Sequence, residues 1–362
     1  MDKILLFCGL TGFKLLLDLN VALRDSNDNW DPTNALELIQ YIGRQPNHPP
    51  ILFQLGNEPN SFLRIIKRTI SAQQLAHDYK TLRKLLDGHG FRDSPLFGPE
   101  VTSPKKELLE TPPDQYLKDF LSCDPPVKHI SWHQYYVDGR EATSHNFTDP
   151  AVFDRLQKEI DIFSRVVQSQ SNKSMVLTET GSAWGGGAAN LSDKFIAGFM
   201  LMDKLGIAAK NGIKLVTRQA IYHGHYALLD NRIQPNPDYW IALLYSRLTS
   251  GGKDSRVYST NPQPDKRVRV YAHSGYNNSI IVMVVNVSPH SSEFRLTFDG
   301  KVFSQYEQFV LTPLHGNLQS SVSLLNNHKL KMVGDNLPPL DGIMAGRVHS
   351  PPYSVGFYRT LA

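Results

Sequence analysis

The stretch "PPILFQLGNEPN" (49–60) is an apolar run that ends on polar residues. Apolar side chains at almost every position predict a strand covered on both faces, which is typical of a parallel α/β sheet. Asn57 and Glu58 come directly after this strand, and Pro59 follows them. Two explanations fit a glutamate at that point: it caps the next helix, or its carboxyl group takes part in a reaction at the strand end.

Five more apolar segments of this kind alternate with amphipathic helices in the first 250 residues. The predicted strands are 13–20, 49–57, 94–101, 127–136, 173–181 and 213–222, and the predicted helices are 31–42, 71–88, 149–167, 192–206 and 237–248. Asp31, followed by Pro32, and Ser71 are the expected N-terminal signals of the first two helices. This alternation predicts a parallel sheet that is either open or closed into a barrel.

From about residue 251 the pattern changes to short β-rich segments that are separated by turn residues and lack a helical period. Examples are 267–274, 279–288, 304–314 and 353–361. Such segments predict an antiparallel β-sandwich of roughly a hundred residues. We therefore expect an α/β domain over 1–250 and a β-sandwich domain over 251–362.

The composition is that of a globular protein with material for a large core: 362 residues, 41% hydrophobic and 20% charged. A net charge of +4 suits a polyanionic ligand without requiring one. The two cysteines, Cys8 and Cys123, cannot make a disulfide framework. We expect no metal, no cofactor and no nucleic-acid partner.

Targeting signals give a weaker indication. No apolar run is long enough to span a membrane, and Lys14 interrupts the apolar N-terminal stretch, so we interpret that stretch as the start of the fold and not as a signal peptide. Five glycosylation motifs suggest secretion, at Asn146, Asn172, Asn190, Asn277 and Asn286.

Polar residues stand at the carboxyl ends of several predicted strands, and in a barrel these ends open onto one face. Besides Glu58, the polar residues at these strand ends lie in the segments 133–136, 178–180 and 218–219. Glu58 and Glu179 are 121 residues apart, which allows three strand–helix units of roughly 30 residues each with insertions. Two glutamates facing each other across a barrel mouth predict glycoside hydrolysis, in which one donates a proton and the other attacks the sugar.

Several long motifs resemble the heparanase family, the endo-β-glucuronidases that cut heparan sulfate. They are "FQLGNEPNSF" (53–62), "SWHQYYVDGR" (131–140), "LTETGSAWGGGAANLSD" (177–193), "AGFMLMDKLG" (197–206) and "NPDYW" (236–240). The resemblance covers nearly the whole chain. It implies a (β/α)8 TIM barrel joined to a β-sandwich and a retaining mechanism, with Glu58 as acid/base and Glu179 as nucleophile.

The resemblance also implies substrate contacts. The positions that hold the sugar or orient the nucleophile are occupied by Asn57, Tyr135, Arg140, Gln219 and Tyr226. Gly185 and Gly186 lie in a "GGG" loop whose bare backbone lets a uronate carboxylate reach N–H donors. Lys105 and Lys106 form a basic pair where sulfate groups would be met, although the sequence alone favours an ordinary solvated loop.

The chain departs from the family pattern at three points. Trp184 stands where the family commonly has tyrosine, and Ser274 stands where vertebrate members have a cysteine in the sandwich. The segment 13–20 matches the third barrel strand, so the first two strands are missing from this chain. In the family a separate N-terminal small subunit supplies them. The resemblance implies a secreted protein of the extracellular matrix or the lysosome.

Three functions remain in competition at this point. The leading one is an endo-β-glucuronidase on heparan sulfate, and the intact pair of glutamates separates it from the inactive members of the family. The second is a non-catalytic protein that binds heparan sulfate, because an incomplete barrel would not support turnover. The third is another retaining glycosidase of the same clan, such as an exo-β-glucuronidase.

Overall fold

The computed structural model describes residues 1–104, 111–249, 255–261 and 263–361. The chain forms two compact units, which we describe separately. Unit 1 comprises Met1–Gln134, Lys158–Glu179 and Ile213–Thr217, and unit 2 comprises Tyr135–Gln157, Thr180–Gly212 and Arg218–Ala362.

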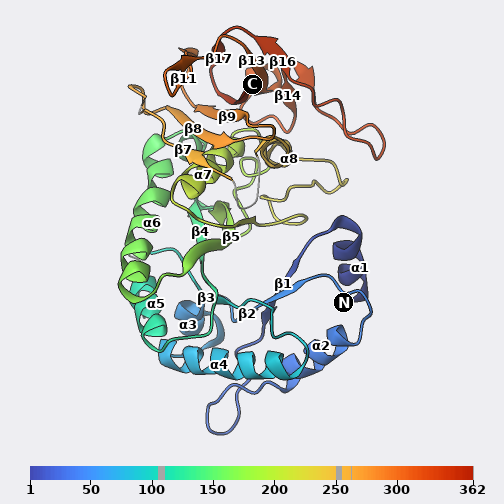
Figure 1. The fold of residues 1–362 in the computed structure, drawn as a ribbon, viewed down its shortest axis with the longest axis vertical. Helices are drawn as coiled ribbons and strands as arrows, with labels where there is room; N and C mark the ends of the chain where they lie inside the picture. The colour runs from blue at the N-terminus through green and yellow to red at the C-terminus, as the bar shows by residue number, and fades with distance from the viewer. Residues whose placement is uncertain (105–110, 250–254, 262, 362) are drawn as a thin grey trace. The chain divides into compact units, whose positions relative to one another are not determined.

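Unit 1 is built on parallel strands (Figure 1). In chain order the strands are β1 (Leu15–Leu19), β2 (Ile51–Leu55), β3 (Phe97–Val101), β4 (His129–Asp138), β5 (Ser174–Trp184) and β6 (Val216–Arg218). β1 pairs with β2, a parallel bridge from Phe53 to Leu96 links β2 to β3, and the sheet continues in the order β3-β4-β5-β6. β4 and β5 run on from unit 1 into unit 2. All six predicted strands are thus confirmed, β6 being much shorter than expected.

Helices α2, α4 and α5 lie along the outer side of these strands (Figure 1). The helical segments are α1 (Asp2–Thr11), α2 (Thr33–Gly43), the 3₁₀ helix η1 (Pro59–Ser61), α3 (Phe62–Ile66), α4 (Ala72–Gly88), α5 (Pro113–Ser122) and α6 (Pro150–Gln170). The hydroxyl of Ser71 accepts the backbone N–H of Gln74 at 3.1 Å, so the predicted cap of α4 is confirmed. Asp31 accepts the N–H of Thr33 at 3.0 Å, but α2 begins at Thr33 with Pro32 at the cap position, one residue later than predicted. α5 was not predicted.

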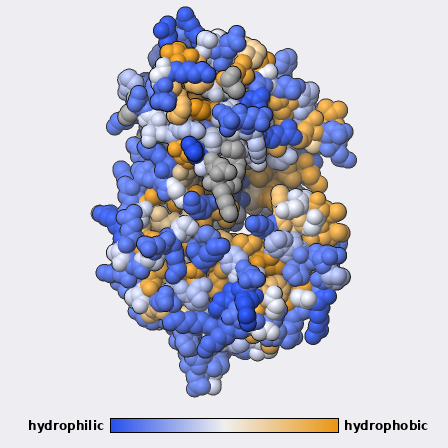
Figure 2. Space-filling view, viewed as in Figure 1, coloured by the Kyte–Doolittle hydropathy of each residue, from blue (hydrophilic) through white to orange (hydrophobic). Residues whose placement is uncertain are grey.

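The N-terminal helix α1 carries exposed apolar side chains next to β1. The exposed residues are Ile4, Leu6, Phe7 and Leu10, with Phe13 just beyond the helix. Figure 2 shows apolar surface on the side where Figure 1 places α1. Within the described part of the chain β1 pairs with β2 alone. An apolar surface beside an unpaired strand edge is a place where another chain or segment can pack.

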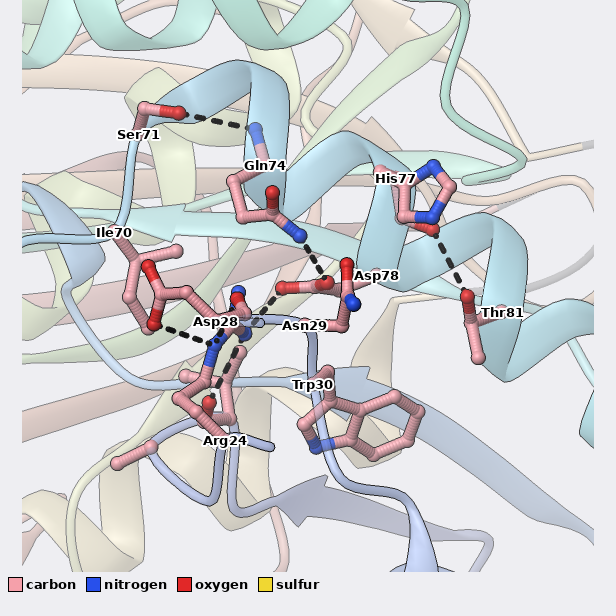
Figure 3. Close-up of polar contacts among 12 residues, drawn as sticks. Arg24, Asp28, Asn29, Trp30, Ile70, Ser71, Gln74, His77, Asp78 and Thr81 are labelled. Atoms are coloured by element: carbon pink, nitrogen blue, oxygen red, sulfur yellow. Dashed lines mark hydrogen bonds and ion pairs between the residues drawn. The ribbon is translucent and has the colours of Figure 1, made fainter. Parts of the chain in front are cut away.

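A buried ion pair ties the segment after β1 to α4 (Figure 3). Nη1 of Arg24 lies 2.5 Å from Oδ2 of Asp78, and both side chains are 1% exposed. The side-chain amide of Gln74 donates to the other carboxylate oxygen of Asp78 at 2.9 Å. Because removing one partner would leave an uncompensated buried charge, this pair fixes where the loop crosses the helix.

Unit 2 contains the helices α7 (Ala197–Lys210) and α8 (Pro237–Leu248) and an antiparallel sheet. The sheet has the order β15-β14-β13-β18-β9-β8-β7, with β16 on β13. Its strands are β7 (Val257–Tyr258), β8 (Val268–Ser274), β9 (Ile280–Asn286), β13 (Tyr306–Pro313), β14 (Ser323–Leu325), β15 (His328–Lys329), β16 (Ile343–Ala345) and β18 (Ser354–Thr360). The predicted antiparallel C-terminal region is confirmed.

The centre of this sheet is covered on both faces. β9 is buried at every position, because α7 packs against β8, β9 and β18 on one face. On the other face a core that includes Val282, Tyr306 and Tyr358 also contains Val348 from β17 (Val348–Ser350). β17 pairs with β10 (Ser292–Phe294). Neither β17 nor β16 was predicted.

A buried cluster of charges joins β8 to the helices of unit 2. Nε of Arg269 lies 2.5 Å from Oδ1 of Asp203 on α7, and its Nη1 lies 2.8 Å from Asp154 on α6. The hydroxyl of Tyr271 also donates to Asp203 at 2.5 Å. Asp203 is fully buried, so the attachment of α7 to the sheet depends on this arginine.

The proposed domain boundary at 250/251 falls on residues that the structure does not describe, and it stays a prediction, as does the β-sandwich. Among the described helices, none is both long enough and apolar enough to cross a bilayer.

Candidate active site

The end of β2 turns sharply and presents Glu58. Gly56 has a φ of +85°, and a Cβ there would come within 2.5 Å of Val21, so the turn needs glycine. Glu58 itself is left-handed, with φ 54° and ψ 54°, and Pro59 begins η1 directly after it. The N–H of Glu58 donates to the carbonyl of Glu100 at 3.0 Å, which ties this turn to β3. The side chain of Glu58 is therefore held on a short, constrained turn.

Glu58, His133 and Glu179 come together within unit 1. Nδ1 of His133 lies 3.0 Å from Oε1 of Glu58 and 3.9 Å from Oε2 of Glu179. One side-chain atom from each of the three lies within 4.8 Å of the others. His133 is 2% exposed, whereas the two glutamates are 22% and 30% exposed. Two carboxyl groups that reach solvent thus lie close together in front of a buried imidazole.

A third glutamate lies behind the histidine. Glu100, on β3, is fully buried, and its Oε2 lies 2.8 Å from Nε2 of His133. The same oxygen accepts the hydroxyl of Thr178 at 2.7 Å. Each ring nitrogen of His133 therefore faces a carboxylate, which favours a ring that donates from both nitrogens.

These carboxylates keep His133 charged. Burial lowers the pKa of His133, but hydrogen bonds to Glu100 and Glu58, with the charges of Glu100 and Glu179, outweigh burial and raise the pKa to about 10. Asp18 on β1 interacts electrostatically with the same residues, His133 and Glu100. Although this residue reaches solvent, desolvation of its carboxyl group and then the charge of Glu100 raise the pKa of Asp18 to about 6. Among the described residues, the site therefore combines one cation, His133, with the carboxyl groups of Asp18, Glu58, Glu100 and Glu179.

The same atoms offer the geometry of a metal site, since Glu58, His133 and Glu179 each bring one possible ligand atom into range. A histidine binds a metal through the lone pair of a neutral ring nitrogen. His133 is held as a cation with carboxylates at both nitrogens, so these residues do not fit a metal ion.

Sequence reasoning missed Asp18 and Glu100 and assigned no role to His133. For Asp18 and Glu100 the sequence did contain a signal. Asp18 and Glu100 are the charged residues inside the otherwise apolar strands β1 (LLLDL) and β3 (FGPEV). A charge in a strand covered on both faces needs a partner, and that rule would have singled both out.

Three of the predicted substrate-binding residues come together in unit 2. The hydroxyl of Tyr135 donates to Oε1 of Gln219, and its ring stacks on Tyr226 with centroids 6.4 Å apart. Arg218 holds this group from behind, because it donates to the carbonyls of Gln219, at 2.8 Å, and of Tyr226. Asp238, 2.6 Å from the guanidinium, fixes Arg218 in turn.

The glycine loop lies against the same segment. Gly185, Gly186 and Gly187 all have positive φ, between 78° and 92°, which other residues rarely adopt. The carbonyl of Gly186 accepts the N–H of His225 at 2.6 Å, and a Cβ at Gly187 would come within 2.7 Å of the backbone nitrogen of Tyr226. Glycine thus suits the backbone conformation of this loop, and the prediction that Gly185 and Gly186 present N–H donors to a uronate carboxylate stays a prediction.

The remaining predicted residues are less constrained. Arg140 is exposed and pairs with Asp138 at 2.5 Å, and Asn57 is exposed beside Glu58. Lys105 and Lys106 lie outside the described residues, and the predictions for them stay predictions.

Comparison with known proteins places the chain in a family. The profile of glycosyl hydrolase family 79, N-terminal domain, matches residues 10–206. Heparanase from Gallus gallus is 35% identical over 376 residues, which cover 99% of this chain and 70% of that protein. The chain belongs to glycosyl hydrolase family 79, the heparanase family.

Two further similarities bear on this family assignment. Inactive heparanase-2 from Mus musculus is 31% identical over 99% of this chain and 63% of its own length. The crystal structure of a 4-O-alpha-L-rhamnosyl-beta-D-glucuronidase from Fusarium oxysporum matches with a TM-score of 0.72 at 16% identity, over 99% of this chain and 79% of that one. The fold is therefore the (β/α)8-like domain with a C-terminal antiparallel sheet found in these hydrolases. The chain spans about two thirds of the length of the curated relatives it matches.

Proposed function

We propose that this protein is a retaining β-glucuronidase that cuts heparan sulfate within the chain. The observation that carries the proposal is the pair Glu58 and Glu179, whose carboxyl oxygens lie within 4.8 Å in one site with His133. Retaining glycosidases hold their two carboxyl groups about 5–5.5 Å apart, whereas inverting enzymes leave roughly 6.5–9.5 Å for a water molecule.

In the proposed mechanism each glutamate has one task. A carboxylate oxygen of Glu179 attacks the anomeric carbon while the carboxyl group of Glu58 gives its proton to the departing glycosidic oxygen. This leaves a glycosyl ester on Glu179 and a carboxylate on Glu58. Glu58 then takes a proton from water, the resulting hydroxide attacks the same carbon, and the ester bond to Glu179 breaks. Overall, one glycosidic bond and one water molecule are consumed, with retained configuration.

The unit 2 residues supply the proposed recognition of the sugar. Bare N–H groups at Gly185 and Gly186 suit a uronate carboxylate, because positive φ at successive residues turns the backbone donors outward. Tyr135, Gln219 and Tyr226 offer a polar and aromatic group for the sugar ring. Asn57 and Arg140 are further proposed contacts.

We further propose that an N-terminal segment or small subunit adds strands to β1. The supporting observations are the edge of β1, which pairs with β2 alone among the described residues, and the exposed apolar side chains of α1. By the same resemblance we propose secretion to the extracellular matrix or the lysosome, an α/β domain over 1–250 and a β-sandwich domain over 251–362.

The proposal is tested by expressing the chain alone and together with an N-terminal small-subunit fragment from the same genome. Heparan sulfate is incubated with each preparation, and product length is followed by size-exclusion chromatography. Fragments of intermediate length support an endo-acting enzyme, and free glucuronate points to an exo-acting one. The proposed activity is excluded if neither preparation cleaves heparan sulfate or an aryl glucuronide.

A non-catalytic heparan-sulfate-binding protein is the second proposal, favoured by the match to inactive heparanase-2. It predicts retention on immobilised heparan sulfate without any cleavage by either preparation.

If Lys105 and Lys106 bind sulfate groups, replacing both by alanine should raise the KM for heparan sulfate several-fold. The KM for a small aryl glucuronide should change little, because that substrate carries no sulfate. Added salt should reduce the difference on heparan sulfate, since exposed charges are screened within about 10 Å at 0.1 M salt. Equal effects on both substrates would count against this placement.

A further inference from the structure

We propose that Glu100 is a positioning residue: it holds a proton on Nε2 of His133, so that Nδ1 of the ring and Glu58 share the proton used in catalysis. The inference extends the proposed glycosidase mechanism and rests on it for its catalytic part. Glu100 does not reach the surface, so it acts through the imidazole.

The contacts around His133 carry this inference. Oε2 of Glu100 lies 2.8 Å from Nε2, and Oε1 of Glu58 lies 3.0 Å from Nδ1. Oε2 of Glu100 accepts the hydroxyl of Thr178, and as a carboxylate oxygen it also accepts an N–H from Nε2. The proton at Nδ1 then lies in the hydrogen bond to Glu58, along which it can pass to the carboxylate during the reaction.

The cost of this arrangement argues for a task. A fully buried carboxylate is expensive to desolvate, and a well-packed apolar residue is often at least as stable in such a position. Glu100 is 0% exposed, has a positive φ of 61°, and no described group lies within hydrogen-bond distance of its Oε1. These three features of Glu100 lower the stability of the fold. In return, the carboxylate of Glu100 is held against Nε2 of His133.

All charged groups that face His133 bear on its titration. Glu58 follows β2, Glu100 lies on β3 and Glu179 on β5. Asp18 on β1 interacts with His133 through its charge. Tyr79 on α4 interacts with Glu100, but its hydroxyl is neutral, since it donates to the carbonyl of Phe97 at 2.7 Å and burial raises its pKa well above the usual value.

The sign of the expected effect follows from charge. The negative charge of Glu100 stabilises the protonated form of His133. Glu100→Gln keeps an oxygen that accepts from Nε2 and removes the charge, so this proton should leave at lower pH. Glu100→Asp keeps the charge and should restore most of the wild-type behaviour. Glu37→Gln, at an exposed glutamate on α2, is the matched control.

The first measurement needs no substrate. The ring nitrogens of His133, assigned through backbone correlations, are followed by ¹H–¹⁵N NMR between pH 5 and pH 11 in the full 362-residue chain. In the wild type His133 should stay protonated at pH 7 and titrate near pH 10. In Glu100→Gln the midpoint should fall by at least one unit, a tenfold change in the protonation equilibrium. A neutral His133 in the wild type at pH 7, or an unchanged midpoint in Glu100→Gln, would overturn the inference.

The second measurement addresses catalysis. In Glu100→Gln the alkaline limb of kcat/KM on heparan sulfate should move down by about one pH unit, because His133 loses at lower pH the proton that it shares with Glu58 in the reaction. The formation of the glycosyl-enzyme from a dinitrophenyl glucuronide should hardly change, since that leaving group needs no proton. A uniform loss on both substrates without a pH shift would mean a merely structural role. If the NMR shift is seen but the wild type cleaves neither substrate, the proposed function fails and the charge relation between Glu100 and His133 stands.

Discussion

Glu179→Gln should abolish turnover on every glucuronide substrate, by at least about 10⁴-fold in kcat, because no other group in the site replaces the attacking carboxylate. Glu58→Gln should behave differently. It should slow heparan sulfate cleavage strongly, since that leaving group needs a proton, and spare the first step for a dinitrophenyl glucuronide. The glycosyl-enzyme should then accumulate, giving a burst followed by slow release.

Azide separates the two roles. It needs no general base, so it should restore turnover of Glu58→Gln and give the glucuronyl azide with retained β configuration. The assignment is wrong if azide rescues Glu179→Gln with retained configuration and fails to rescue Glu58→Gln. Glu37→Gln again serves as the control for the loss of one exposed charge.

Arg269→Met should destabilise unit 2 by about 3–5 kcal/mol, since it leaves the fully buried Asp203 without its cation. Urea unfolding, followed by fluorescence at pH 7, measures the change. The loss of stability caused by Arg269→Met should become smaller as the pH falls toward 4. Burial raises the pKa of Asp203, and without Arg269 this carboxyl group can take a proton inside the folded protein, so the raised pKa favours folding at low pH.

Two variants control this prediction. Arg267→Met removes an arginine whose partner Asp265, at 2.9 Å, is as exposed as itself, and little or no change is expected. The double variant Arg269→Met/Asp203→Asn removes both charges and keeps an acceptor for Tyr271, so it should recover most of the lost stability. If Arg269→Met lowers the free energy of unfolding no more than Arg267→Met does, the charge cluster does not anchor α7.

The sequence by itself determined the elements whose signals are local. The apolar runs around 49–57 and 127–136 predicted strands, Ser71 predicted the start of α4, and the break in pattern near residue 251 predicted the change to antiparallel structure. Glu58 and Glu179 were predicted as a catalytic pair from their places after strands, and the structure brings them together. The predictions of strands, of the α4 cap and of the change in pattern succeeded because strand and helix periods and caps depend on neighbours within a few residues. The catalytic role of the two glutamates stays a prediction.

Only the tertiary structure decided what surrounds that pair. His133 meets Glu58 across 75 residues of chain and Glu100 across 33, and Arg269 meets Asp203 across 66. No local pattern encodes such meetings, since they depend on which strands lie side by side and in what register. The same holds for β16 and β17, which are three residues long and exist only because a partner strand is there to pair with them. Burial makes these contacts decisive, because the protonation state of a group far from water depends on the few groups that contact it.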